Sequence, residues 1–393
     1  MFHVKQRRVL GLLALAGVLA VIAAGCVSSA GTRGWAGPVH SANVLIVSSG
    51  GGRIDGIGSD GRQAWRFPEI WKIPERKAEK LKGIYGPPVL SADGKVVFVG
   101  DYNGYVYAFR PGDYTPGQTV DQPVAASYPL DGAVIGGILL DSAKDTLYAT
   151  SKNKVYSLRA SNLVERISNR DALVVAAIVF QANDDVWSAP VLAGGKLLFS
   201  SLDGNLYAVD PDTGAEKWRF KADKGLVTAS VAGDLVLTSG FNSTLYAVDV
   251  DDGSERWSFK ANHWIWAKPA VSQGVAYVGD FDGVVHAVSL SDGTESWSLA
   301  LDKGALRASP AIASGTLIVS TADGWLLGID TSSHEIVWQR DIGSALNADI
   351  TVDGSSVYIA PKGCVTPESG GDKVYYTQVN PSNGDLTAAT GVC

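Results

Sequence analysis

The sequence predicts an all-β protein folded as a β-propeller with eight blades of four antiparallel strands each, with seven blades as the alternative count. Three observations lead to this prediction. Trp218, Trp257, Trp297 and Trp338 recur at intervals of about 40 residues, a period typical of propeller blades rather than of helical solenoids. Within each repeat, apolar and polar residues alternate, as in strands with two different faces. The 393 residues include 45 Gly and 11 Trp but only 1 Met, which favours strands and tight turns over packed helices.

The start of the chain has the pattern of an export signal. Basic residues within 1–8 precede an uncharged apolar run over 9–24 that is short for a bilayer span. Small residues then lead to Cys26, an arrangement that resembles the signal of bacterial lipoproteins, in which this cysteine is acylated. We therefore expect a lipoprotein signal peptide over 1–25, a lipid on Cys26 and a flexible tether over 26–34. The alternatives are a plain cleaved signal or an uncleaved anchor with an incidental cysteine.

The remaining residues, 35–393, are predicted to form a single propeller domain. Each blade begins with a segment of small residues and Pro, which suits a crowded innermost strand beside a central channel. In the most regular repeat this strand is 187–191, and the next two strands are 196–200 and 205–210, with the outermost strand beginning at Lys217. The eight predicted blades begin near residues 35, 84, 134, 187, 226, 265, 306 and 346.

Two insertions interrupt the repeat, and both are expected between the body of one blade and the start of the next. Residues 68–83 are basic and contain Trp71, whereas residues 161–180 contain an apolar run. Variable segments on a regular scaffold are common recognition sites, so both are candidate binding segments. The alternatives are a solvated charged loop for the first insertion and an over-long outer strand for the second.

A recurring motif ends each regular repeat. Residues 208–218 read AVDPDTGAEKW, which has the form A-x-D-x-x-T-G-x-x-x-W. This motif resembles the tryptophan-docking motif of the pyrroloquinoline-quinone (PQQ) repeat β-propellers, also called quinoprotein-like propellers. In it the Trp can lie over the next blade, the Asp can order a turn and the Gly permits that turn; the motif is structural and does not imply catalysis. The residues that match it are Ala208, Asp210, Thr213, Gly214, Trp218, Ala247, Asp249, Gly253, Trp257, Gly293, Trp297, Asp330 and Trp338.

The superfamily has two branches with different functions. One holds PQQ-dependent oxidoreductases, which bind calcium, are usually much longer and keep a pair of adjacent cysteines that this chain lacks. The other is the BamB family of exported lipoproteins, which are scaffolds in outer-membrane β-barrel assembly. The length, the blade count and Cys26 resemble the second branch. The resemblance implies a non-enzymatic scaffold with no catalytic residue, metal or cofactor, and PQQ with calcium remains the enzymatic alternative.

The same resemblance implies a location and a set of partners. The protein is expected to be exported and anchored by its lipid to the cell membrane or the outer membrane, facing the periplasm or the exterior. It is expected to be a monomer within a complex, bound to protein partners in the cell envelope. Nucleic acid is not expected as a partner, because the net charge is −7 and the mature part has no basic tract beyond one short loop.

Few residues outside the repeat motif suggest a site. No nucleophile elbow, P-loop or zinc-protease motif occurs. His263, Trp264 and Trp266 enter the sixth predicted blade, where two indoles can line the mouth of the channel. Together with Trp71 they are the candidate binding residues, and a surface lipoprotein that binds a ligand or polysaccharide is a further functional alternative. Ordinary packing is the other interpretation, as it is for His286, which replaces the Tyr of the other repeats.

The two remaining cysteines lie near the end of the chain. Because an exported protein is in an oxidising environment, Cys364 and Cys393 can form a disulfide. The bond would close a loop of roughly 30 residues and stabilise the last blade by about 3 kcal/mol. Two free thiols are the alternative.

Overall fold

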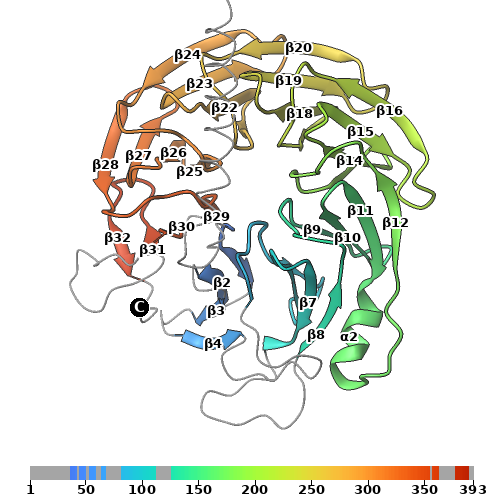
Figure 1. Ribbon diagram of the computed structural model, residues 1–393. Helices are drawn as coiled ribbons and strands as arrows, with labels where there is room; N and C mark the ends of the chain where they lie inside the picture. Colours follow the sequence, from blue (N-terminus) through green and yellow to red (C-terminus); the bar gives the residue numbers. More distant parts are fainter. Residues whose placement is uncertain are drawn as a thin grey trace, which may run out of the picture.

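The chain forms a closed ring of β-sheets around a central channel (Figure 1). The computed structural model describes residues 36–41, 44–49, 53–58, 63–67, 81–111, 125–354, 356–362 and 377–388. Within these residues the strands make eight sheets of four strands each, and every pairing is antiparallel. The predicted fold class is therefore confirmed, with eight blades rather than seven.

Each blade consists of four strands that follow one another in the sequence, from the innermost strand at the channel to the outermost at the rim (Figure 1). Blade 1 contains β1 (Val39–Ser41), β2 (Val44–Ser49), β3 (Arg53–Gly58) and β4 (Gln63–Phe67). Blade 2 contains β5 (Val89–Leu90), β6 (Val97–Gly100), β7 (Tyr105–Phe109) and β8 (Ala125–Pro129). Blade 3 contains β9 (Ile138–Asp141), β10 (Thr146–Ser151), β11 (Lys154–Arg159) and β12 (Ala176–Gln181). Blade 4 contains β13 (Val191–Ala193), β14 (Lys196–Ser200), β15 (Asn205–Val209) and β16 (Glu216–Lys221).

The second half of the ring repeats this order. Blade 5 contains β17 (Ser230–Ala232), β18 (Leu235–Ser239), β19 (Thr244–Asp249) and β20 (Glu255–Lys260). Blade 6 contains β21 (Ala270–Ser272), β22 (Val275–Gly279), β23 (Val284–Ser289) and β24 (Glu295–Ala300). Blade 7 contains β25 (Ala311–Ala313), β26 (Thr316–Ser320), β27 (Trp325–Asp330) and β28 (Ile336–Asp341). Blade 8 contains β29 (Thr351–Asp353), β30 (Ser356–Ile359), β31 (Thr377–Val379) and β32 (Leu386–Ala388).

This strand order gives the ring two different faces. Because neighbouring strands are antiparallel, the turns between second and third strands emerge on the same side as the connections from one blade to the next. We call this side the interblade face. The turns between first and second strands and between third and fourth strands emerge on the opposite side, the hairpin face.

The innermost strands begin later than predicted. In blade 4 the predicted strand 187–191 is mostly connection, and pairing starts only at Val191, opposite Leu198. Pro190 has no N–H group to donate to a ladder, so the strand begins directly after it. By contrast, the second strand of this blade has the predicted bounds, Lys196–Ser200.

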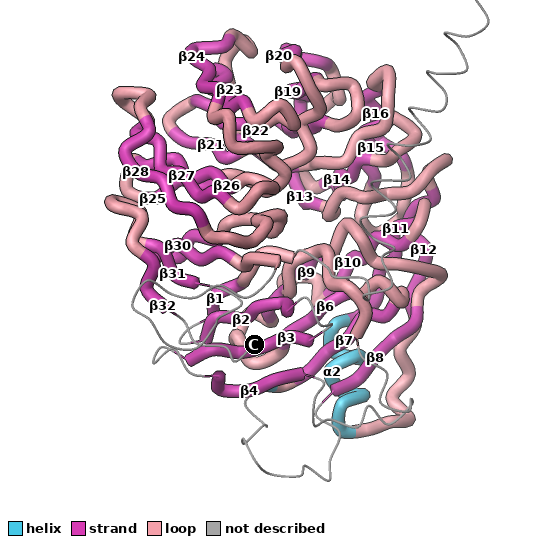
Figure 2. Tube along the Cα trace, turned by 60° about the vertical axis from the view of Figure 1, so that its left-hand side comes forward, coloured by secondary structure: helices cyan, strands magenta, loops and turns pink. Residues whose placement is uncertain are grey.

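The insertion at 161–180 is not where the sequence placed it. Instead of joining two blades, it lies inside blade 3, where the helix α2 (Ala160–Ser168) and the strand β12 follow β11. Ala160, Leu163 and Ile167 recur at helical spacing and are buried. They join the apolar cluster between blades 2 and 3, so α2 packs on β7 and β8 (Figure 2).

The hydrophobic core of the ring lies between blades. The described residues form eight buried apolar clusters, and each cluster combines side chains from two neighbouring blades. The ring closes where blade 8 meets blade 1: Leu45, Val47 and Ile57 pack against Tyr358 and Ala360. No strand is exchanged at this closure in the described part of the chain, because blades 1 and 8 each use four consecutive strands. Closure therefore depends on this packing and on the hydrogen bond that the Thr351 hydroxyl donates to the carbonyl of Pro38.

Tryptophans of the outermost strands tie blades 4, 5, 6 and 7 to the blades that follow them. The indole Nε1–H of Trp257 donates to the carbonyl of Leu290, which follows the third strand of blade 6, at 2.7 Å. Trp218 and Trp338 make equivalent bonds to Val250 at 3.0 Å and to Pro381 at 2.7 Å. Trp297 instead stacks on the ring of His334, with centroids 4.9 Å apart. His334 stands where the other turns have Gly, with φ +65°.

The motif aspartates order the turns that follow the third strands. Oδ1 of Asp210 accepts hydrogen bonds from the amides of Asp212 and Thr213, and Lys217 lies 3.0 Å from Oδ2. The amide of Thr213 and the Lys217 ammonium hold the pKa of Asp210 well below its usual range. The carboxylate is therefore charged at any physiological pH and keeps the turn closed.

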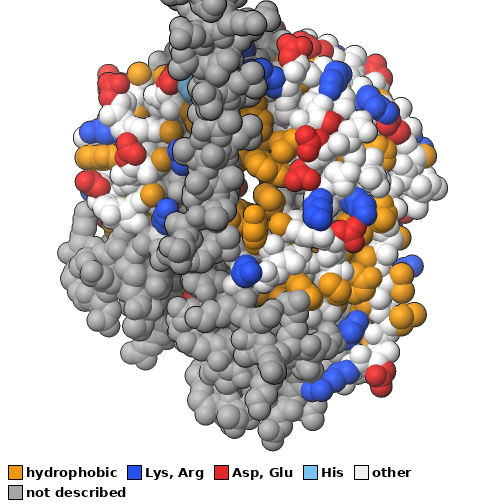
Figure 3. All heavy atoms as spheres, viewed as in Figure 1, with side chains coloured by type: hydrophobic (Ala, Val, Ile, Leu, Met, Phe, Trp, Pro, Cys, Tyr) orange, Lys and Arg blue, Asp and Glu red, His pale blue; other side chains and the backbone are white. Residues whose placement is uncertain are grey.

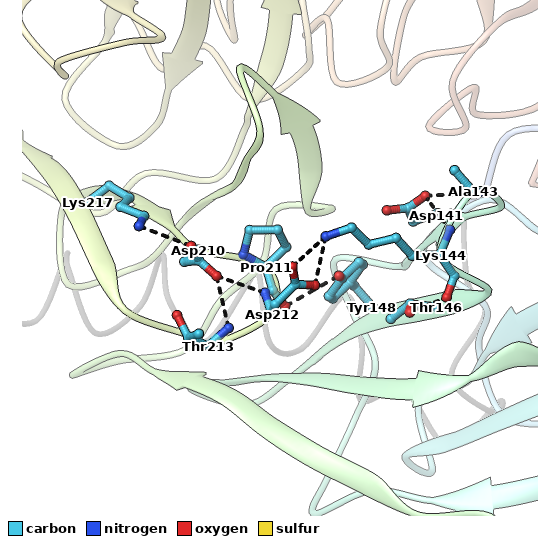
Figure 4. Close-up of polar contacts among 10 residues, drawn as sticks. All are labelled: Asp141, Ala143, Lys144, Thr146, Tyr148, Asp210, Pro211, Asp212, Thr213 and Lys217. Atoms are coloured by element: carbon cyan, nitrogen blue, oxygen red, sulfur yellow. Dashed lines mark hydrogen bonds and ion pairs between the residues drawn. The ribbon is translucent and has the colours of Figure 1, made fainter.

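Blade 3 replaces the docking tryptophan with other contacts (Figure 4). β12 contains no Trp, and the carbonyl that would receive one, that of Pro211, instead accepts a hydrogen bond from the Tyr148 hydroxyl at 3.4 Å. Lys144 adds an ion pair with Asp212 at 2.6 Å. The blade 3–blade 4 contact thus keeps the acceptor carbonyl but takes its donor from β10.

We predict that Gly253→Ala destabilises the ring through the docked tryptophan. A Cβ atom at Gly253 would lie 2.6 Å from Cδ2 and Cε3 of Trp218, at φ +77°. We expect a loss of about 3–5 kcal/mol in the free energy of unfolding, measured by urea denaturation, because overpacking adds to backbone strain.

Gly274→Ala is the matched control. Gly274 has the same φ, +77°, but a Cβ there would meet nothing within 4 Å. We expect it to lose only about 1–2 kcal/mol, the strain term alone. Equal losses in the two variants would show that the tryptophan contact contributes nothing.

Candidate functional site

An aromatic cluster lies at the mouth of the channel on the interblade face. Its members are half-buried and come from connections rather than from strands. Trp264 and Trp266 lie in the connection from blade 5 to blade 6, as the sequence predicted for the candidate binding residues. The full cluster consists of Trp187, Phe241, His263, Trp264, Trp266 and Phe281.

The rings of this cluster contact one another across three blades. Phe241, in the β18–β19 turn, packs edge-on against Trp264 and Trp266, with centroids 5.2 and 5.7 Å away. Phe281, in the β22–β23 turn, lies 5.8 Å from Trp264 and 6.2 Å from Trp266. Trp187, which leads into blade 4, reaches Trp266 at 6.0 Å. The cluster is thus one continuous aromatic surface, and Figure 3 shows hydrophobic side chains along the inner rim of the ring.

Backbone and side-chain bonds fix the position of this surface. The amide of Phe281 donates to the carbonyl of Trp264 at 3.1 Å. His263 stacks on Phe281 at 5.8 Å, and its Nδ1 accepts the Trp264 amide at 2.7 Å. The two predicted indoles are therefore held by the neighbouring turn, so the surface exists before any ligand arrives.

Charged groups border the aromatic cluster on two sides. The exposed guanidinium of Arg307 lies over the ring of Phe281, 5.3 Å from its centroid. On the other side, Asp184 and Asp185 precede Trp187, and burial together with the Asp184 carboxylate raises the pKa of Asp185. An apolar surface with a cationic and an acidic border suits a protein ligand.

Sequence reasoning missed half of the cluster. Phe241 and Phe281 occupy the same position in two successive repeats, just after the second strand. Tyr102 has this position in blade 2, where it lies 5.5 Å from Tyr85. The recurrence of an aromatic residue at this place was a usable signal. Trp187 and Trp266 also begin the same recurring segment, in WSAPV and WAKPA, but the sequence did not show that the two rings are in contact.

Several predicted site residues lie outside the described part of the chain. These are Cys26, Trp71, Cys364 and Cys393. The lipid on Cys26, the role of Trp71 and the disulfide remain predictions.

His286 is buried between two carboxylates of blade 6. It is buried on β23 at the place where Tyr107, Tyr207 and Tyr246 stand in other blades. Its Nδ1 lies 2.7 Å from Oε1 of Glu295, and its Nε2 lies 3.3 Å from Oδ2 of Asp280, the residue before Phe281. The histidine thus joins the outermost strand of blade 6 to the turn that carries one ring of the cluster.

The two carboxylates shift the titration of this histidine. Burial acts to lower the pKa of His286, but its hydrogen bonds with Asp280 and Glu295 outweigh burial and raise it above 6.5. Burial likewise acts to raise the pKa of Asp280, but hydrogen bonds from His286 and from the Val284 amide outweigh it and lower the pKa. The charged pair is therefore favoured in the folded protein.

We predict that stability falls as the pH rises through the raised pKa of His286. Because the folded protein holds this proton more tightly than the unfolded chain, the stabilisation is complete below the ordinary pKa of 6.5 and is lost above the folded-state value. Urea midpoints measured between about pH 6 and pH 9 should decrease for this protein. The urea midpoint of His286→Tyr, which restores the tyrosine of other blades, should decrease less over this pH range. If the midpoints of the variant and of the unaltered protein fall in parallel as the pH rises, His286 is not the group that causes the decrease.

Two observations concern other kinds of site. Among the residues that the structure describes, no three His, Cys, Asp or Glu side chains come together as metal ligands. In the same residues, no helix is both long and apolar enough to cross a bilayer.

Comparisons with known proteins agree with this fold. A family model described as "Outer membrane protein assembly factor BamB" matches residues 181–360 and 242–391. Curated protein sequences give no significant match. The crystal structure of BamB from Moraxella catarrhalis is similar, with a TM-score of 0.60 and 17% sequence identity over 83% of this chain and 91% of that one. The computationally designed protein Ika8 is also similar, with a TM-score of 0.60 and 12% identity over 76% of this chain and 84% of Ika8.

The likeness to the two solved structures shows the fold alone, because sequence identity is low in both. The family model goes further, since its two matches together span more than half of the 393 residues. The chain belongs to the PQQ-repeat propeller family of the outer membrane protein assembly factor BamB.

Proposed function

We propose that this protein is a non-enzymatic interaction scaffold of the cell envelope that binds a protein partner through the aromatic cluster. The observation that carries the proposal is the half-buried, preformed surface around Trp264, Trp266, Phe241 and Phe281. Trp and Arg are enriched among the residues that dominate binding energy at protein interfaces, and Arg307 borders this surface. A lipid on Cys26 would hold the scaffold at a membrane.

The family supports a role in assembly. Its model is described as an outer membrane protein assembly factor, and one structural relative is BamB itself. For this chain we therefore propose a partner within a complex that assembles outer-membrane proteins. A ring whose blades are stabilised by their neighbours is a rigid platform, which lowers the entropy cost of binding at its loops.

A quinone-dependent oxidoreductase is the enzymatic alternative. It predicts a channel lined by several carboxylates and an Arg. The described residues at the aromatic cluster are rings bordered by Arg307 and by Asp184 and Asp185, and among the described residues no three His, Cys, Asp or Glu side chains form a metal-ligand group. Reduction of a dye that depends on added PQQ and calcium would favour the enzyme over the scaffold.

We predict that replacing both Trp264 and Trp266 with Ala abolishes partner binding without unfolding the ring. Both side chains are half-buried rather than buried, so the variant should keep the unfolding midpoint of the core. A photo-crosslinking residue at Arg307 in intact cells should yield a discrete conjugate, and its yield should drop at least about tenfold in the double variant.

The matched control is Val337→Ala, which shortens an exposed apolar side chain on the outermost strand β28. It should leave the conjugate unchanged. Equal yields from the double variant and the unaltered protein would refute the aromatic cluster as the contact surface. Retention of the purified protein on a polysaccharide column, lost in the double variant, would favour a carbohydrate-binding surface instead.

A further inference from the structure

Asp280 joins the aromatic cluster to the buried His286. It is fully buried itself and directly precedes Phe281, one of the rings of the cluster. Its Oδ1 accepts the amides of Asp282 at 3.0 Å and of Val284 at 2.9 Å, and these bonds close the turn that carries Phe281. Its Oδ2 lies 3.3 Å from Nε2 of His286. The Asp280 carboxylate is therefore the link between the histidine and the position of the Phe281 ring.

The backbone of Asp280 also holds the next connection of the ring. Its carbonyl accepts the amide of Leu306 at 3.1 Å, in the connection from blade 6 to blade 7. Leu306 is followed by Arg307, whose guanidinium lies over the ring of Phe281. Asp280 thus positions both a ring of the cluster and the cation at its border.

Blade 2 has the same aspartate without the histidine. Asp101 occupies the position of Asp280 and is likewise fully buried. Tyr107 stands in the place of His286, and its hydroxyl lies 3.5 Å from Oδ2 of Asp101. Burial raises the pKa of Asp101, whereas at Asp280 hydrogen bonds, the first of them from His286, outweigh burial and lower the pKa. We attribute the charged state of Asp280 to the imidazole beside it.

A neutral imidazole cannot serve both of its carboxylates. Protonated His286 donates through Nδ1 to Glu295 and through Nε2 to Asp280, but the neutral ring keeps one hydrogen only. If that hydrogen stays on Nδ1, the lone pair of Nε2 faces Asp280; if it moves to Nε2, Glu295 loses its donor. In both cases the buried Asp280 carboxylate loses the positive charge beside it, which destabilises its burial.

Within blade 6, no further charge is placed against the histidine by the strands. The side chains opposite His286 on β22 and β24 are uncharged, and Glu295 is the one charged residue of these strands besides it. Tyr277, the other titratable side chain of the four strands, packs toward blade 7. The turn after β22 adds Asp282, which is exposed.

Blade 5 faces the histidine with an aromatic ring. The centroid of Phe259, on β20, lies 5.2 Å from that of the His286 ring. The cations of the same strand, Arg256 and Lys260, bind acceptors within blade 5, and Glu255 is exposed at its start. Asp280 and Glu295 are therefore the charged groups that set the titration of His286.

We propose that His286, acting through Asp280, makes partner binding at the aromatic cluster depend on pH, with binding strongest when the histidine is protonated. This regulation rests on the proposed function, because the surface that it controls is the proposed binding surface. Once the imidazole is neutral, the Asp280 turn opens to water or its carboxylate takes up a proton. Either change releases Phe281 and the Leu306–Arg307 connection from the positions that the partner binds.

The coupling acts in both directions. A partner that binds only the ordered surface stabilises the protonated histidine, so an occupied surface holds this proton more tightly than an empty one. The effect differs from the loss of stability at high pH, because it changes the affinity of a protein that stays folded.

The first test follows the turn in the protein alone. Phe281 is replaced by 4-fluorophenylalanine, and the fluorine resonance is followed between about pH 6 and pH 9. We expect one transition with a midpoint above 6.5, and no such transition in His286→Tyr. His263, which stacks on Phe281, is present in both proteins. A transition that persists in His286→Tyr belongs to another group, and this result or the absence of any transition would overturn the proposal.

Glu295→Gln tests the same histidine without replacing it. The change removes one of the two hydrogen bonds to carboxylates that favour the charged imidazole, so the midpoint should fall by at least about 0.5 pH unit. Glu255→Gln is the matched control, since Glu255 has the position of Glu295 in blade 5, where Tyr246 replaces the histidine. It should leave the midpoint unchanged, and equal midpoints in the two variants would contradict the assignment.

The second test measures binding. The conjugate formed by a photo-crosslinking residue at Arg307 is measured in cells equilibrated at about pH 6 and about pH 8.5, and its yield should be at least about fivefold higher at the lower pH. The yield from His286→Tyr should be the same at both pH values. Unfolding midpoints identify a variant that fails to fold. Glu295→Gln, in which binding should weaken at a lower pH than in the unaltered protein, then supplies the comparison.

The outcomes separate the regulation from the proposed function. Equal pH dependence of the yield in the unaltered protein and in His286→Tyr would show that the partner titrates, and would overturn the regulation alone. A yield that does not depend on pH in the unaltered protein would do the same. Absence of a conjugate at every pH would refute the proposed binding surface and its regulation together.

Discussion

The packing of each blade against the next is the constraint on which the rest of this structure depends. A twisted four-stranded sheet has two faces and no core of its own, so its apolar side chains can be buried only by a neighbouring sheet. The described apolar clusters accordingly lie between blades. The docked tryptophans reinforce this packing, because each gives an indole ring to the next blade and satisfies a carbonyl there.

The same constraint positions the candidate site. Once the blades are fixed, the connections on the interblade face have little freedom at their ends. Residues far apart in the sequence, such as Trp187 and Phe281, then meet around Trp266. Binding surfaces assembled from loops on a rigid scaffold are common among proteins, and here the loops also hold one another through the Phe281–Trp264 backbone bond.

The features that distinguish one blade of this protein from another occur where the sequence departs from the repeat. Blade 3 has no docking tryptophan in β12 and contains the helix α2. Blade 6 replaces a tyrosine with His286, which links Asp280 and Glu295. Blade 7 replaces a turn glycine with His334, and the docked tryptophan stacks on its ring. The regular blades stabilise the ring, whereas the departures from the repeat give it surfaces and charges that differ from blade to blade.

The sequence by itself determined the period and the turn that follows the third strand, because these follow from local alternation and from residues such as Asp210 and Gly214. It favoured eight blades but left seven open. It also identified Trp264 and Trp266 as candidates. Only the tertiary structure decided that Phe241, Phe281 and Trp187 complete their surface, and that α2 belongs to blade 3 and covers β8. The physical reason is that local patterns report which face of a strand is buried, whereas contacts between turns of different blades depend on how the closed ring brings them together.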